Sequence, residues 1–177
     1  MRRLGRVKVA SVLFDDEAKD GLIEYIARLR ALHLWFHGAH HLTHGSGYSG
    51  DHAELFDRIY TEIQDEVDGA VEKAVGVTND PTAGCPLRIT KDAAEILCEY
   101  ESPARLSARD IAAEGLKMEK AYIVFLEGFF KYLEDQDMLT LGLNDAIAAS
   151  ANTHETYVYL LQQRVRDDGS AGRVVTS

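Results

Sequence analysis

The sequence contains 177 residues, of which 46% are hydrophobic and only three are proline, a composition typical of one folded domain rich in helix. Its formal net charge of −10 argues against a protein that coats nucleic acid through a basic surface, and it suits a container that attracts cations. No apolar run approaches the length of a membrane-spanning helix, which argues against an integral membrane protein of the helical type.

The cysteines and the N-terminus indicate the compartment. Cys85 and Cys98 make no metal motif and no disulfide framework, which favours a reducing cytosol. The N-terminal segment lacks the apolar core and the cleavage site of a signal peptide. We therefore expect a cytoplasmic protein.

The first 14 residues are expected to form a flexible basic arm, because they carry Arg2, Arg3, Arg6 and Lys8 and no acidic residue. Such an arm could touch the phosphates of DNA. Four charges give only weak, salt-sensitive binding, so a solvated tail is the simpler interpretation.

A first helix is expected over residues 16–44, where apolar residues recur at three- and four-residue spacing. The residues of this apolar side are Leu22, Ile26, Leu29, Leu32, Trp35, Phe36, Ala39 and Leu42. Gly45, Gly47 and Gly50 then end the helix and make a turn.

A second helix is expected over residues 51–76, with an apolar side of its own. The residues of that side are Leu55, Phe56, Ile59, Ile63, Val67, Ala70, Val71 and Ala74. Segments 79–81 and 84–86 break the chain, and a short helix over about 90–100 fits a connection that crosses the bundle.

Two more long helices complete the chain. Ser107 followed by Asp110 predicts the start of the third helix, whose aromatic residues at helical spacing belong to a core. The fourth helix is expected from about 138 to 166, and residues 167–177 are expected to form a flexible polar tail. The predicted fold is all-α: a four-helix bundle over residues 15–166, with one long crossover between helices 2 and 3, which is the ferritin-like arrangement.

Histidines and carboxylates gather at the junction of the first two helices and predict a metal site. Asp57, Asp68 and Glu72 project within roughly 60° of one another at about 100° per helical residue. Imidazole together with carboxylate suits iron, manganese or zinc better than magnesium, calcium or copper(I), and iron is the favoured interpretation. The histidines at three- and four-residue spacing are His33, His37, His40, His41 and His44.

This stretch resembles the Dps-like mini-ferritins of the ferritin-like superfamily. The end of the first helix, His40 through Tyr48, has the family's pattern of a histidine followed by a glycine and an aromatic residue. A second histidine, His52, lies twelve residues after His40, and Asp57, Asp68 and Glu72 reproduce the family's carboxylate spacing. At the level of pattern the resemblance covers most of residues 15–166.

One position departs from the family pattern. The second histidine usually lies four residues before the first aspartate, whereas His52 lies five before Asp57. An unbroken helix would therefore turn His52 away from the face that carries Asp57, Asp68 and Glu72. His52 can join the site only if the helix begins at or after it, with Asp51 as N-cap and Glu54 three residues later, or if the helix contains a bulge.

The resemblance implies a metal site made of His40, His52, Asp57, Asp68 and Glu72, with His40, His52, Asp68 and Glu72 carrying catalysis. Asp57 could instead orient a ligand. The implied activity is ferroxidase: oxidation of Fe(II) by hydrogen peroxide or dioxygen, with Fe(III) stored in a hollow dodecamer, which protects DNA from oxidative stress. The sites would be shared at two-fold interfaces, with histidines from one subunit and carboxylates from the other.

Several alternatives stay open at this point. The chain could be a Dps-like shell that binds Zn or Mn at the same site with little ferroxidase activity, or a protein that compacts DNA through its basic arm. His37 and His44 could line an entry path or act as auxiliary ligands, and His41 occupies a place where the family often has tryptophan. His154, on the last helix, is expected to be structural.

Overall fold

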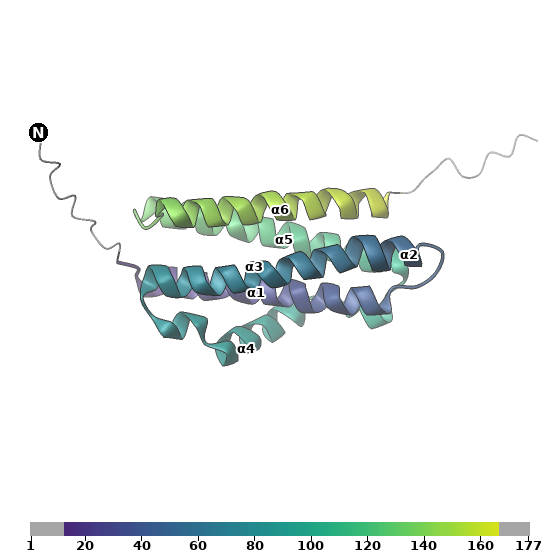
Figure 1. The fold of residues 1–177 in the computed structure, drawn as a ribbon, viewed down its shortest axis with the longest axis horizontal. Helices are drawn as coiled ribbons and strands as arrows, with labels where there is room; N and C mark the ends of the chain where they lie inside the picture. The colour runs from purple at the N-terminus through teal and green to yellow at the C-terminus, as the bar shows by residue number, and fades with distance from the viewer. Residues whose placement is uncertain (1–12, 167–177) are drawn as a thin grey trace, which may run out of the picture.

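The computed structural model describes residues 13–166, which form a bundle of four long helices (Figure 1). The long helices are α1 (Asp16–Leu42), α3 (Asp57–Thr78), α5 (Ala108–Asp135) and α6 (Leu141–Val165). Helix α2 (Tyr48–Gly50) and a π-helical turn, Asp51–Phe56, lead directly into α3. Helix α4 (Pro86–Leu97) lies between two 3₁₀ turns, Pro81–Gly84 and Pro103–Arg105. The described residues contain no strand, so the predicted all-α class is confirmed.

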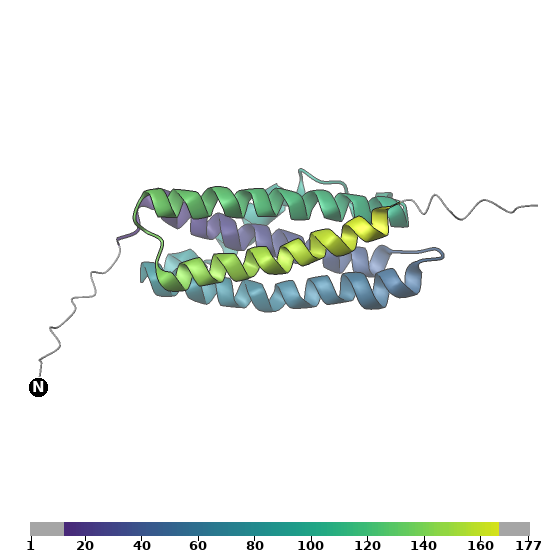
Figure 2. The same ribbon diagram turned by 90° about the horizontal axis from the view of Figure 1, so that it is seen from above.

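The helices form two antiparallel pairs, α1 with α3 and α5 with α6, as the two views show (Figures 1 and 2). Helix α4 packs against α1 on the outside of the bundle. It lies in the connection that returns the chain to the opposite end of the bundle, where α5 begins. The predicted ferritin-like topology, with a short helix in the crossover, is therefore confirmed.

The ends of the elements differ slightly from those expected. Helix α4 begins four residues earlier than predicted, at Pro86, whose missing N–H costs nothing at a helix start. Ser107 caps α5 as expected, because its Oγ accepts a hydrogen bond from the Asp110 backbone N–H. Phe14, which we placed in the arm, is buried in the core, so the bundle starts one residue earlier. The expected arm over residues 1–12 and the tail over 167–177 lie outside the described residues.

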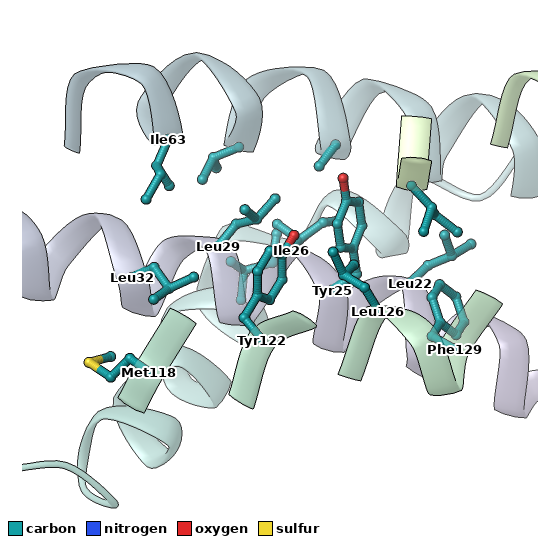
Figure 3. Packing of buried hydrophobic residues seen from close by; sticks show 14 of the residues in the cluster. Leu22, Tyr25, Ile26, Leu29, Leu32, Ile63, Met118, Tyr122, Leu126 and Phe129 are labelled. Carbon is teal, nitrogen blue, oxygen red and sulfur yellow. The ribbon is translucent and has the colours of Figure 1, made fainter. Parts of the chain in front are cut away.

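The core lies along the axis of the bundle, where the apolar sides of the helices meet (Figure 3). Side chains of α1 interlock there with Ile63 of α3 and with Met118, Tyr122 and Leu126 of α5. Burying a leucine or isoleucine side chain stabilises a fold by about 1.5–3 kcal/mol, so these stripes dominate the stability of the bundle. Leu42, at the end of the stripe expected for α1, is 43% exposed.

Gly115 marks a close approach between α5 and α1. A Cβ at this position would lie 2.8 Å from Cε1 of Phe36, which is fully buried and cannot move away freely. Gly128 lies on the same helix, and a Cβ there would meet nothing within 4 Å.

We therefore expect Gly115→Ala to destabilise the fold by about 1–3 kcal/mol through overpacking. Gly128→Ala, the matched control, is expected to stabilise it by up to about 1 kcal/mol through helix propensity alone. Equilibrium urea unfolding measures both changes. Equal effects of the two substitutions would show that α1 and α5 do not pack this closely.

Candidate metal centre

The turn between α1 and α3 positions the candidate site and is anchored to α6. Gly45 adopts a left-handed conformation with φ of 85°, which reverses the chain after α1. Arg164 of α6 then holds the buried Asp51 through two hydrogen bonds, Nε to Oδ1 at 2.6 Å and Nη2 to Oδ2 at 2.8 Å. Asp51 is thus the anchor of the turn and not an N-cap. The prediction of a helix start near His52 is wrong, because the helical path already begins at Tyr48.

The π-helical turn resolves the spacing problem at His52. The backbone N–H of Asp57 donates to the carbonyl oxygen of His52, five residues earlier, instead of to the residue four earlier. One additional residue is thereby accommodated within a single turn. Of the two routes that could bring His52 into the site, the bulge is the one that the structure contains.

His40 and His52 face each other across this turn. Their rings stack with centroids 3.9 Å apart. His40 Nδ1 lies 2.9 Å from the carbonyl oxygen of His52, and His52 Nδ1 lies 2.7 Å from the carbonyl oxygen of His40. A carbonyl oxygen can only accept, so both Nδ1 atoms must donate, and in the neutral imidazoles both Nε2 atoms carry the lone pair. This reciprocal pair holds two imidazoles in a tautomer that leaves Nε2 free to bind a metal ion.

Asp57 adds a carboxylate next to the histidine pair. Its Oδ1 lies 3.8 Å from His40 Nδ1, and its side chain is 48% exposed. His40 itself is buried. His40, His52 and Asp57 therefore form one group, which we call the histidine half-site.

Asp68 and Glu72 lie elsewhere on the same helix. Asp68 follows Asp57 by eleven residues, which corresponds to about 16 Å along α3. Both carboxylates are exposed and one helical turn apart, and Asp68 lines a hollow of about 310 Å³ beside Arg30. Within residues 13–166 no three His, Cys, Asp or Glu side chains are arranged to hold a metal ion. Asp68 and Glu72, which we call the carboxylate half-site, are not brought to the histidines within one chain.

The remaining histidines of α1 form a row beside Tyr60 of α3. His37 and His41 touch through their Nε2 atoms at 3.1 Å, and His33 stacks on His37 with centroids 6.0 Å apart. Burial lowers the pKa of His33, and the charge of Arg30 lowers it further. His44 lies beyond the row, with Nδ1 3.2 Å from the carbonyl oxygen of Leu42.

A second polar group lies inside the bundle, and the sequence interpretation did not identify it. His154 and Glu119 are fully buried, with His154 Nδ1 2.5 Å from Glu119 Oε2. On its other side, His154 Nε2 lies 3.2 Å from Glu66 Oε2. Glu119 precedes Tyr122 by three residues and so lies on the apolar stripe of α5, which was the signal in the sequence.

The charges of this buried group favour a bound proton. Burial alone lowers the pKa of His154, but the charges of Glu119 and Glu66 and their hydrogen bonds raise it to about 9. Burial raises the pKa of Glu119, and His154 offsets only part of that rise. The triad of Glu66, Glu119 and His154 therefore holds its proton more tightly than the isolated groups would.

A groove of about 530 Å³ runs between α3 and α6 beside this triad. Glu66 forms part of its wall, together with Tyr25, Glu62 and Asp145. Tyr157 donates a hydrogen bond of 2.6 Å to Glu62, which fixes that carboxylate in the wall of the groove. His154 contacts Glu66 of the groove wall from the buried side. The structural role that we expect for His154 is still a prediction.

Comparisons with protein-family models and with curated proteins give no match for this sequence. Solved structures do match. A tetragonal form of Mycobacterium smegmatis Dps is 20% identical, with a TM-score of 0.70 over 86% of this chain and 89% of that one. A point mutant of M. smegmatis Dps1 is 21% identical, with a TM-score of 0.70 over 86% of this chain and 100% of that one.

The likeness extends over nearly the whole of the described bundle. Another M. smegmatis Dps structure covers 91% of this chain and 90% of its own, at 19% identity and a TM-score of 0.69. None of the helices within residues 13–166 combines the length and the apolar character that spanning a membrane requires. At this level of identity a structural match establishes the fold, and the chain therefore has the Dps-like, ferritin-like fold that its histidine and carboxylate pattern resembles.

Proposed function

We propose that this chain is a mini-ferritin that oxidises Fe(II) with hydrogen peroxide or dioxygen and stores the Fe(III) product in a hollow oligomer. The observation that carries the proposal is the division of the ligands into two half-sites. His40, His52 and Asp57 converge at one end of α3, and Asp68 and Glu72 lie about 16 Å further along the same helix.

A second copy of the chain would complete each half-site. In an interface with two-fold symmetry, each subunit uses the same patch, and the two copies of α3 can run antiparallel. The histidine half-site of one subunit then meets the carboxylate half-site of its partner, twice per interface. The shell implied by the sequence resemblance, a dodecamer with sites at its two-fold interfaces, has this geometry.

The ligand set suits the proposed chemistry. Imidazole and carboxylate ligands bind Fe(II) with positions left open, and carboxylate charge stabilises the more highly charged Fe(III). Each Fe(II) gives up one electron, so two ferrous ions reduce one peroxide. The net charge of −10 would help to concentrate the cationic substrate around the protein. Removing free iron and peroxide together would protect nearby DNA.

The test is to add Fe(II) anaerobically to the purified full chain, then hydrogen peroxide or air, and to follow Fe(III) by absorbance. We expect oxidation much faster than in buffer, with the iron remaining in solution inside a particle many times the mass of one chain by light scattering. A stable monomer would exclude the shared site. An intact shell that binds Zn or Mn but oxidises no Fe(II) would exclude the ferroxidase.

A further inference from the structure

Helix α1 presents two histidines that the half-sites do not include. His37 and His41 are one helical turn apart and both side chains are exposed. Their Nε2 atoms lie 3.1 Å from one another. In the chain without a metal, one of these nitrogens must carry a proton and the other a lone pair.

This separation matches the distance between two nitrogens bound to one metal ion. Imidazole nitrogens bind zinc at about 2.0–2.1 Å, so two of them at angles of 90° to 109° lie roughly 2.8–3.4 Å apart. The observed 3.1 Å falls inside that interval. The two nitrogens therefore already have the separation that one bound ion requires.

Neighbouring rings hold both histidines in place. The Tyr60 ring lies 4.8 Å from that of His37, and the His33 ring stacks at 6.0 Å on the same residue. The ring of His40 packs edge-on against His41 at 4.9 Å. Both ligands also project from one continuous helix, so little conformational freedom remains to be lost on binding.

The pair is distinct from the histidine half-site. His40 directs its Nδ1 to the carbonyl oxygen of His52 and stacks on that residue, in the turn that follows α1. The contact between His37 and His41 lies within α1 itself. Formation of the pair requires neither the π-helical turn nor the carboxylates of α3.

We propose that His37 and His41 form a second metal site, which binds a borderline divalent ion, Cu(II) in preference to Zn(II). Imidazole suits both ions, and for a given set of nitrogen ligands affinity is highest for Cu(II). Water completes the coordination, because both side chains are open to solvent. This site goes beyond the proposed oxidation of iron and does not depend on it.

The test is a titration of the assembled, iron-free full chain with copper(II) chloride, read by low-temperature electron paramagnetic resonance. We expect a signal with couplings from two imidazole nitrogens that requires His37 and His41 and persists in His40→Gln. His37→Gln and His41→Gln should each lower the affinity of this site at least 10–100-fold, and the double variant should do no more than either single one. His44→Gln, at an exposed histidine of the neighbouring turn, is the matched control and should change nothing.

Three results would overturn the proposal. Unchanged copper titrations in His37→Gln and His41→Gln would mean that the pair is only hydrogen-bonded. An equal loss in His44→Gln would indicate unspecific binding. Loss of the two-nitrogen signal in His40→Gln would place the copper in the shared iron site, and that outcome would leave the ferroxidase proposal intact.

Discussion

Glu72→Ala and His40→Gln are each expected to lose rapid Fe(II) oxidation, and hybrid shells of the two variants are expected to regain part of it. Loss of a residue that supports a metal ligand typically lowers metal affinity or activity by about 10–100-fold. Loss of a direct ligand should lower them at least as much. Glutamine is chosen at position 40 because His40 is buried, and an amide of similar size fills its place while it presents no imidazole nitrogen to the metal.

The hybrid experiment tests whether the site is shared. When the two variants are unfolded together and reassembled in equal amounts, each site needs its histidine from a Glu72→Ala chain and its carboxylate from a His40→Gln chain. Random mixing in a two-fold interface gives such sites a frequency of about one quarter, so about a quarter of the wild-type rate should return. Stopped-flow absorbance measures this rate.

The controls separate loss of ligands from loss of structure. Circular dichroism and light scattering should show unchanged helix content and particle mass for both variants. Glu134→Ala, which removes an exposed carboxylate far along α5, should oxidise iron at the wild-type rate. Hybrids as inactive as their parents would mean that all ligands come from one chain, which contradicts the half-sites.

His154→Leu is expected to destabilise the bundle more than any surface substitution. It removes one partner of a buried ion pair and leaves Glu119, which is fully buried, without a positive charge. Breaking such a pair typically costs about 3–5 kcal/mol. For a domain of this size the melting temperature should fall by roughly 10 °C, measured by calorimetry. The double variant Glu119→Leu, His154→Leu, which removes both partners, should recover most of the loss.

The same variant should also change how stability depends on pH. His154 has a pKa of about 9 in the fold against 6.5 when free, so the folded chain binds the proton more tightly. Its stabilising contribution is fully present below about pH 6.5 and is lost as the pH rises through about 9. The melting temperature of the wild type should therefore fall over this interval, and that of His154→Leu should change much less. Parallel curves for the two proteins would show that His154 is not charged in the fold.

The fold could be predicted from the sequence because its determinants are local and repetitive. The apolar stripe of α1 recurs at every turn, and Ser107 with Asp110 marks a helix start by its own hydrogen bonds. The position of His52 could not be predicted, because it depends on which carbonyl the Asp57 N–H selects. The π-helical turn that makes this choice begins at Asp51, which is held by Arg164 of the distant helix α6, a contact that no local pattern contains.

The polar sites, too, could be predicted only in part from the sequence. Spacing along α3 was sufficient to place Asp57, Asp68 and Glu72 on one face, since a regular helix fixes the angle between residues. The partnership of Glu119 with His154 was not predicted, because it joins residues 35 positions apart on two helices. A single glutamate on an apolar stripe indicates burial, but it does not identify the residue that neutralises it.

The π-helical turn at Asp51–Phe56 separates two quantities that are usually treated as one, the number of residues between two ligands and the direction in which they point. An inserted residue ordinarily rotates everything after it by about 100°, which would remove a ligand from its site. Here the insertion widens one turn, and His52 still meets His40. A motif search that counts residues from the second histidine to the first aspartate would reject this chain. A search by angular position around the helix would accept it.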